Sequence, residues 1–232
     1  MTFTTITAAR PDSASVAGRF RFERIAGIAG VFTVAAGVAQ LLIAGVQPGL
    51  GASADTVVAF FAKDVDAHKI GVVMSAVLGI PISVFFVGVH RTLTAADRAR
   101  ESSWATLFLV GAIMLSATAG MSEGLYATAV LRRGEGLAPE TLRMLNDGSQ
   151  IARATFGVWI AVALGSVAAA TFHHGIRARW YGWFCAAAAL LGVLAVIDTV
   201  STGTDGVFAQ LAFGIGVIVW LTITSVLMLR DN

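Results

Sequence analysis

WATLFLVGAIMLSATAGMSEGLYATAVL, residues 104–131, is the stretch that decides the fold. It is apolar over more than the ~20 residues that cross the hydrocarbon core of a bilayer as a helix. One carboxylate, Glu123, interrupts it. Small residues recur at every fourth position, at Ala112, Ser116, Gly120 and Gly124. Small residues let a second helix approach closely, and an acid near that face is expected to point toward protein rather than lipid. We therefore expect the other membrane helices to pack around this one.

The composition of the whole chain supports a membrane protein. Hydrophobic residues make up 56% of the 232 residues and charged residues only 13%. A soluble domain has about 25% charged residues, so lipid must cover much of this surface. The net charge of +2 gives no reason to expect nucleic acid as a partner. The single cysteine, Cys185, excludes an internal disulfide and a multi-cysteine zinc site within one chain.

Six apolar segments predict an all-α, polytopic protein with six transmembrane helices in a bundle. Their approximate bounds are 25–46, 68–90, 104–131, 150–172, 180–200 and 206–229. Residues 1–18 are polar and unpatterned, which predicts a disordered cytoplasmic tail before a single domain over 19–232. The sequence Ala52-Ser53-Ala54 resembles a signal cleavage site, but the apolar segment before it is longer than the ~7–15 residues of a signal peptide.

Two of the connecting segments have the features of short helices that lie on the outer membrane surface. Ser53 can cap a helix whose apolar side includes Val57 and Phe61, and Pro139 suits the first turn of another. Both segments follow a helix that an Arg-x-Arg pair precedes. The first and second helical hairpins are therefore either two copies of one unit or similar for separate physical reasons.

The distribution of basic residues predicts the orientation. With both termini in the cytoplasm, the inner segments hold ten of the 16 Lys and Arg residues. Trp104, Trp180 and Trp183 then fall at the inner interface, where aromatic residues gather. We predict a multi-pass protein of the cell (inner) membrane with cytoplasmic N- and C-termini.

Polar residues near the outer helix ends form the only constellation that could carry a function. They are Gln40, Ser122, Glu123, Arg153, Asp198 and Gln210. In one interpretation they line a polar pocket that opens to the outside and binds a lipid or a small polar or amphipathic ligand. In the other they are interfacial residues solvated by headgroups, with one ion pair that fixes helix register. Either Glu123 or Asp198 could pair with Arg153.

Enzymatic interpretations are weaker. Gly120-Met-Ser122-Glu-Gly124 matches G-x-S-x-G, but the hydrolase motif needs a strand–turn–helix elbow and this one lies within a helix. His90 and His173 end two helices at the same level and could in principle ligate haem, although both stand close to arginines at the headgroup boundary. We predict no cofactor and no metal site.

Several marks along the chain resemble a known group of proteins. They are ASADTVVAFFAKD after the first helix, FFVGVHRTL at the end of the second, and RARWYGWFCAAAALLGVL at the start of the fifth. The pattern resembles the uncharacterised bacterial six-helix integral membrane proteins, over about residues 19–229. This resemblance implies six helices and no particular activity.

Two functions remain from the sequence. The first is a non-enzymatic accessory or ligand-binding bundle with a polar outer pocket at Glu123. The second is a small secondary transporter in which Glu123 or Asp198 binds a proton or cation, although only Pro81 interrupts a span. Besides the bilayer, a second copy of the chain or another membrane protein could pack on the Gly120–Gly124 face.

Overall fold

The computed structural model describes residues 13–98, 102–203 and 207–230, and of these it leaves out the side chains of residues 13–21, 207 and 210. About 90% of the described residues are helical, and they contain no strand. The helices are α1 (Ser13–Ala44), α2 (Ala54–Lys63), α3 (Val65–Arg98), α4 (Trp104–Arg132), α5 (Pro139–Ala154), α6 (Phe156–His174), α7 (Arg179–Thr202), α8 (Val207–Phe213) and α9 (Trp220–Arg230). A 3-10 turn, η1 (Arg133–Glu135), follows α4, and a π-helical segment, η2 (Gly214–Val219), joins α8 to α9.

Six segments of the described chain are long and apolar enough to cross a membrane. They are Phe22–Ala44, Val65–Arg98, Trp104–Glu135, Pro139–His174, Arg179–Thr202 and Leu211–Arg230. Each contains most of one predicted span, so the all-α class and the expectation of six helices long and apolar enough to cross a membrane are confirmed. The chain has the helix lengths and composition of a multi-pass membrane protein.

The helices extend beyond the predicted bounds at several ends. α1 begins at Ser13, so residues 13–18 are helical although a disordered tail was predicted there. Once the apolar segment has nucleated a helix, each further residue adds a hydrogen bond at little cost, which explains the extension. Residues 1–12 of the predicted tail lie outside the described residues.

The two predicted surface helices have different outcomes. α2 is a separate helix, and the Ser53 side chain accepts a hydrogen bond from the Thr56 N–H at 3.2 Å, as the predicted cap should. The helix that begins at Pro139 is not separate. Only Thr155 stands between α5 and α6, and it keeps helical angles (φ −66°, ψ −14°), so a helix begins at Pro139 as predicted but its position on the membrane surface is not confirmed. One face of α5 packs against α4, so this helix has protein rather than membrane surface to cover it.

This difference bears on the proposed repeat. Asp64, with extended angles (φ −151°, ψ 91°), separates α2 from α3, whereas α5 runs almost directly into α6. The outer parts of the two hairpins are therefore built differently. That favours separate physical causes for their similar sequences over two copies of one unit.

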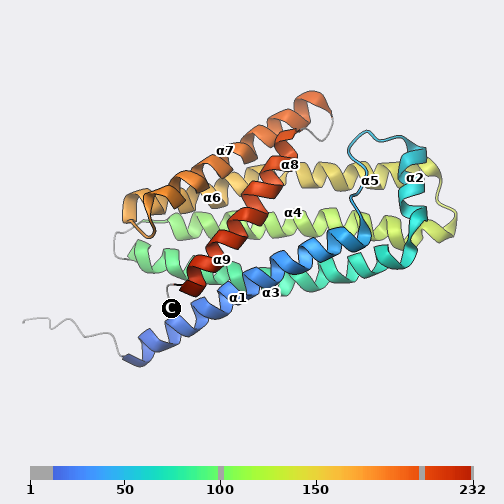
Figure 1. Ribbon diagram of the computed structural model, residues 1–232. Helices are drawn as coiled ribbons and strands as arrows, with labels where there is room; N and C mark the ends of the chain where they lie inside the picture. Colours follow the sequence, from blue (N-terminus) through green and yellow to red (C-terminus); the bar gives the residue numbers. More distant parts are fainter. Residues whose placement is uncertain (1–12, 99–101, 204–206, 231–232) are drawn as a thin grey trace, which may run out of the picture.

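The helices pack in a continuous order from α1 to α7. α1 lies along α3, α4 packs against both α3 and α6, and α6 packs along α7. The last helical segment starts against α7 through α8 and ends against α1 through α9, crossing the others obliquely (Figure 1). α1 begins and α9 ends at one end of the molecule, which we call the proximal end; α2 lies at the opposite, distal end (Figure 1).

Glycines set the closest helix contacts, but not where the sequence suggested. A Cβ at Gly111 of α4 would lie 2.7 Å from the Ala163 backbone nitrogen, so only glycine fits there. At Gly120 and Gly124 no heavy atom lies within 4 Å of the position that a Cβ would take. The tight face of α4 is therefore in its proximal half, and within the described chain no helix packs closely on the Gly120–Gly124 face.

Candidate functional site

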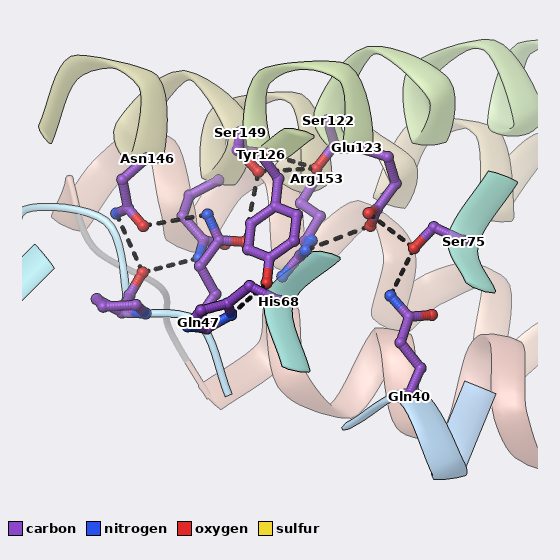
Figure 2. Close-up of polar contacts among 12 residues, drawn as sticks. Gln40, Gln47, His68, Ser75, Ser122, Glu123, Tyr126, Asn146, Ser149 and Arg153 are labelled. Atoms are coloured by element: carbon purple, nitrogen blue, oxygen red, sulfur yellow. Dashed lines mark hydrogen bonds and ion pairs between the residues drawn. The ribbon is translucent and has the colours of Figure 1, made fainter. Parts of the chain in front are cut away.

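Glu123 is the centre of a polar layer that joins four helices toward the distal end. One carboxylate oxygen, Oε2, accepts a hydrogen bond from the Ser75 hydroxyl of α3 at 2.9 Å. The other, Oε1, lies 3.5 Å from a guanidinium nitrogen of Arg153 on α5. The Gln40 side chain of α1 donates its amide N–H to Ser75 Oγ at 2.5 Å. Figure 2 shows Ser75 and Arg153 on either side of the Glu123 carboxylate, with Gln40 reaching Ser75. We call these four residues the polar layer.

The direction of the hydrogen bonds in the polar layer determines which donors and acceptors remain unused. Gln40 donates to Ser75, and Ser75 donates its single proton to Glu123, so the Gln40 carbonyl oxygen remains an acceptor. A carboxylate has about four acceptor positions and a guanidinium five N–H donors, and most of them are not used by these contacts. The side chains of Glu123 and Arg153 are 33% and 36% exposed. A ligand could therefore reach both charges.

Ser122 points away from Glu123, into the contact between α4 and α5. It is fully buried, and its hydroxyl donates to the Ser149 carbonyl oxygen at 3.0 Å. The Ser122 hydroxyl contacts the backbone carbonyl and the hydroxyl of Ser149, and neither partner is a histidine. The side chain serves helix packing, and the G-x-S-x-G match lies inside a regular helix.

Amide side chains fasten the α1–α2 connection onto α5. Gln47 donates to Asn146 Oδ1 at 3.1 Å. Asn146 and Gln150 in turn donate to the Pro48 carbonyl oxygen at 3.1 and 2.8 Å. We call this group the amide clamp (Figure 2). Because Asn146 is fully buried, its bond to Gln47 is shielded from competing water, and the clamp fastens the α1–α2 connection to α5.

His68 fixes α2 above the same region. Its Nε2 lies 3.0 Å from the Phe60 carbonyl oxygen, which can only accept, so Nε2 carries the proton. Its Nδ1 lies within hydrogen-bond distance of the Tyr126 hydroxyl of α4, at 2.8 Å. Val57 and Phe61 of α2 pack in a small core with Tyr126. α2 is thus tied to α3 and α4 by both polar and apolar contacts.

Asp198, which sequence analysis placed at the same level, does not join the polar layer. Its carboxylate accepts from the Phe208 backbone N–H at 3.4 Å, so it supports the start of α8. Arg153 pairs with Glu123 instead, which was one of the two predicted pairings. The Gln210 side chain lies outside the described residues.

The proximal end holds a second polar group. Asp97 at the end of α3 accepts from the Ala105 N–H at 2.6 Å and from the Ser102 hydroxyl at 2.5 Å. His174 Nε2 lies 2.6 Å from Ser102 Oγ and 3.3 Å from an Asp97 oxygen. Asp97 thereby caps α4 and ties the α3–α4 connection to the end of α6.

The two histidines considered for haem have other contacts. His90 Nδ1 lies 3.1 Å from the Ala105 carbonyl oxygen, and His173 stacks on Trp104 with ring centroids 5.9 Å apart. Among the described residues no group of three or more His, Cys, Asp or Glu side chains is arranged to hold a metal ion.

One shallow groove lies between α6 and α7. It has a volume of about 390 Å³ and is lined by apolar residues: Val158, Ala161, Val162, Val193, Val196 and Ile197. None of these belongs to the polar layer. The groove has the chemistry of a lipid-facing surface rather than of a polar binding site.

Sequence reasoning missed Ser75, which accepts from Gln40 and donates to Glu123. Ser75 was grouped with Gly79 and Ser83 as a small-residue stripe, and nothing in that spacing indicates that its hydroxyl bonds to an acid. The amide clamp was also missed. Its signal was the unusual run of amide and hydroxyl residues in Asn146, Ser149 and Gln150, on the side of α5 that a surface helix would turn toward lipid.

No family model, curated protein or solved structure matches this chain. The resemblance to uncharacterised six-helix bacterial membrane proteins therefore remains a prediction from the sequence.

Proposed function

We propose that the protein is a non-enzymatic, multi-pass protein of the cell membrane that binds a small polar or amphipathic ligand at its outer face. In this proposal the six spans form a bundle, both termini are cytoplasmic and the distal end faces outward. The polar layer is the binding site.

The lengths of the helices support this placement. α6 has 19 residues and so rises about 28 Å, close to the ~30 Å thickness of the hydrocarbon core. If α6 spans the bilayer, then Arg153, just before its start, lies at the outer boundary, and most of α5 projects beyond it. Glu123 is about 28 Å along α4 from Trp104, which puts it at the same level. α2 and the amide clamp then form an outer cap.

One observation carries the proposal: an acid and a base, each about one-third exposed, are held side by side with unused hydrogen-bonding capacity. Ser75 and Gln40 orient Glu123, and the amide clamp and His68 hold the surrounding cap. An ion pair that served only helix register would need no second layer of oriented polar groups.

The packing of the proximal half favours binding over transport. Phe85, Phe108 and Trp220 are buried together in an apolar core between the polar layer and the proximal end. A transported ion or proton would have to cross this core, whereas a bound ligand needs access from only one side. The transporter alternative, with Glu123 or Asp198 as the ion site, would require this core to open.

The test is native mass spectrometry of the purified protein in mild detergent. We expect the wild type to retain a ligand that Glu123→Gln loses, because the substitution removes the charge while preserving the shape of the side chain. Asp198→Asn is the matched control, since it neutralises a carboxylate outside the polar layer. Equal retention by wild type and Glu123→Gln, or no retained ligand in any of the three, would contradict the proposal.

A further inference from the structure

We propose that the polar layer recognises phosphoethanolamine chemistry, carried by the headgroup of a phosphatidylethanolamine in the outer leaflet. This inference rests on the proposed function and names the ligand class of that site.

The first argument is charge. Glu123 and Arg153 place a negative and a positive group 3.5 Å apart, both partly exposed. A purely anionic ligand that approaches Arg153 is repelled by Glu123, and a purely cationic one that approaches Glu123 is repelled by Arg153. A zwitterion whose charges are separated by a short linker can satisfy both. In phosphoethanolamine, two carbons separate an ammonium from a phosphate.

The second argument is the inventory of free donors and acceptors. The acceptors left over are on Glu123 and on the Gln40 carbonyl oxygen, and they suit the three N–H donors of a primary ammonium. A trimethylammonium group, as in phosphatidylcholine, has no N–H to donate. The free N–H groups of Arg153 form the planar fork that binds phosphate oxygens. The site therefore prefers ethanolamine to choline, and a zwitterion to an anionic headgroup.

The third argument is the depth of the polar layer in the membrane and the open space beside Glu123. The polar layer lies at the outer boundary if α6 spans the bilayer, which is the depth of phospholipid headgroups. Beside Glu123, Gly120 and Gly124 leave open space where other residues would place a Cβ. Ile113, seven residues before Gly120 and therefore on the same face of α4 nearer the proximal end, is exposed and offers the apolar surface that the acyl chains of a lipid require.

The experiment offers the full-length protein three lipids with identical acyl chains: phosphatidylethanolamine, phosphatidylcholine and phosphatidylglycerol. Bound lipid is counted by native mass spectrometry after delipidation and equimolar addition. We expect wild type to retain phosphatidylethanolamine about tenfold over each of the others, the factor that corresponds to about 1.4 kcal/mol. Glu123→Gln should lose the preference over phosphatidylcholine, and Arg153→Gln should lose retention of both zwitterionic lipids. Asp198→Asn should behave as wild type.

The outcomes separate this inference from the proposed function. Wild type that retains all three lipids equally overturns the inference, and so does a Glu123→Gln protein with an unchanged preference. A different co-purified ligand that still depends on Glu123 would overturn the headgroup assignment and leave the proposed function standing. Soluble glycerophosphoethanolamine serves as the last arm. If this compound displaces the bound lipid, the site recognises the headgroup itself. If a large excess does not displace the lipid and the preference among lipids is unchanged, the ligand is the membrane lipid rather than a soluble compound.

Discussion

The proximal and distal halves of the molecule are held together by different interactions. In the proximal half, Phe85 and Trp220 meet edge to face at 5.4 Å, and Gly111 of α4 lies against the Ala163 backbone of α6. In the distal half, polar side chains connect the helices through the polar layer and the amide clamp. Because lipid tails are as apolar as the helix surfaces, the hydrophobic effect contributes little to helix association in a membrane. Close packing must therefore stabilise the proximal half. In the distal half, no helix packs closely at Gly120, and the charged groups of Glu123 and Arg153 are partly exposed.

The largest effect is expected at the aromatic core. Trp220→Ala removes a buried ring and its N–H bond to the Tyr181 hydroxyl at 3.0 Å, so we expect unfolding to become easier by about 3–5 kcal/mol. Trp183→Ala is the control, because that ring is 68% exposed. Denaturation of both variants in detergent with SDS measures the difference. Similar losses in the two variants would show that the proximal core is not the main source of stability.

A pair of glycines on one helix sharpens the comparison. Gly111→Ala places a methyl group against the backbone of α6 and should destabilise the protein by about 1–3 kcal/mol. Gly120→Ala, nine residues further along α4, meets no atom within 4 Å and should leave stability unchanged or raise it by about 0.5–1 kcal/mol, since alanine favours a helix. The same SDS unfolding experiment applies. A destabilising Gly120→Ala would mean that the distal face of α4 is packed after all, for example against a second copy.

The amide clamp is expected to act locally. Asn146→Leu leaves the Gln47 amide N–H without its partner and removes one of the two donors to the Pro48 carbonyl oxygen, at a cost of about 1–3 kcal/mol. We expect faster hydrogen exchange in residues 45–53 while exchange in the proximal core is unchanged. Gln47→Leu and the double variant complete a cycle, in which the two effects should be less than additive. Full additivity would contradict a direct clamp between them.

The smallest effect on stability is expected at Ser75. Ser75→Ala removes one partly buried hydrogen bond to Glu123, worth about 1 kcal/mol. Ligand retention should fall while the unfolding transition moves little, because Arg153 still holds the carboxylate. Ser83→Ala is the control, since that hydroxyl bonds within its own helix. Unchanged retention in Ser75→Ala would remove Ser75 from the polar layer.

The six spans could be predicted from the sequence because they depend on long apolar runs, which local composition reports directly. The sequence also indicated that Arg153 lies at the level of an acid, but it left Glu123 and Asp198 as equal candidates for the pairing. The continuity of α5 with α6 could not be predicted, because Pro139 and Gly148 resemble the limits of a separate helix. Only the fit of α5 against α4 shows otherwise.

The local environment of each polar residue was the hardest to predict. Asp198 and Glu123 have similar depth and charge, yet one supports the start of α8 and the other bonds to Ser75 and Arg153. Helix rotation decides between these outcomes, and it depends on packing between helices far apart in the sequence. The same cause leaves Gly120 without a close neighbouring helix in the described chain, although its spacing is typical of a packing face.

Hydrogen exchange with and without the co-purified ligand tests the central claim most directly. If the polar layer is the binding site, removing the ligand should speed exchange in residues 70–78, 119–127 and 149–155, and leave residues 158–162 and 193–197 unchanged. The opposite pattern, with the change confined to 158–162 and 193–197, would place the ligand in the apolar groove between α6 and α7. That result would contradict a functional role for Glu123 and Arg153.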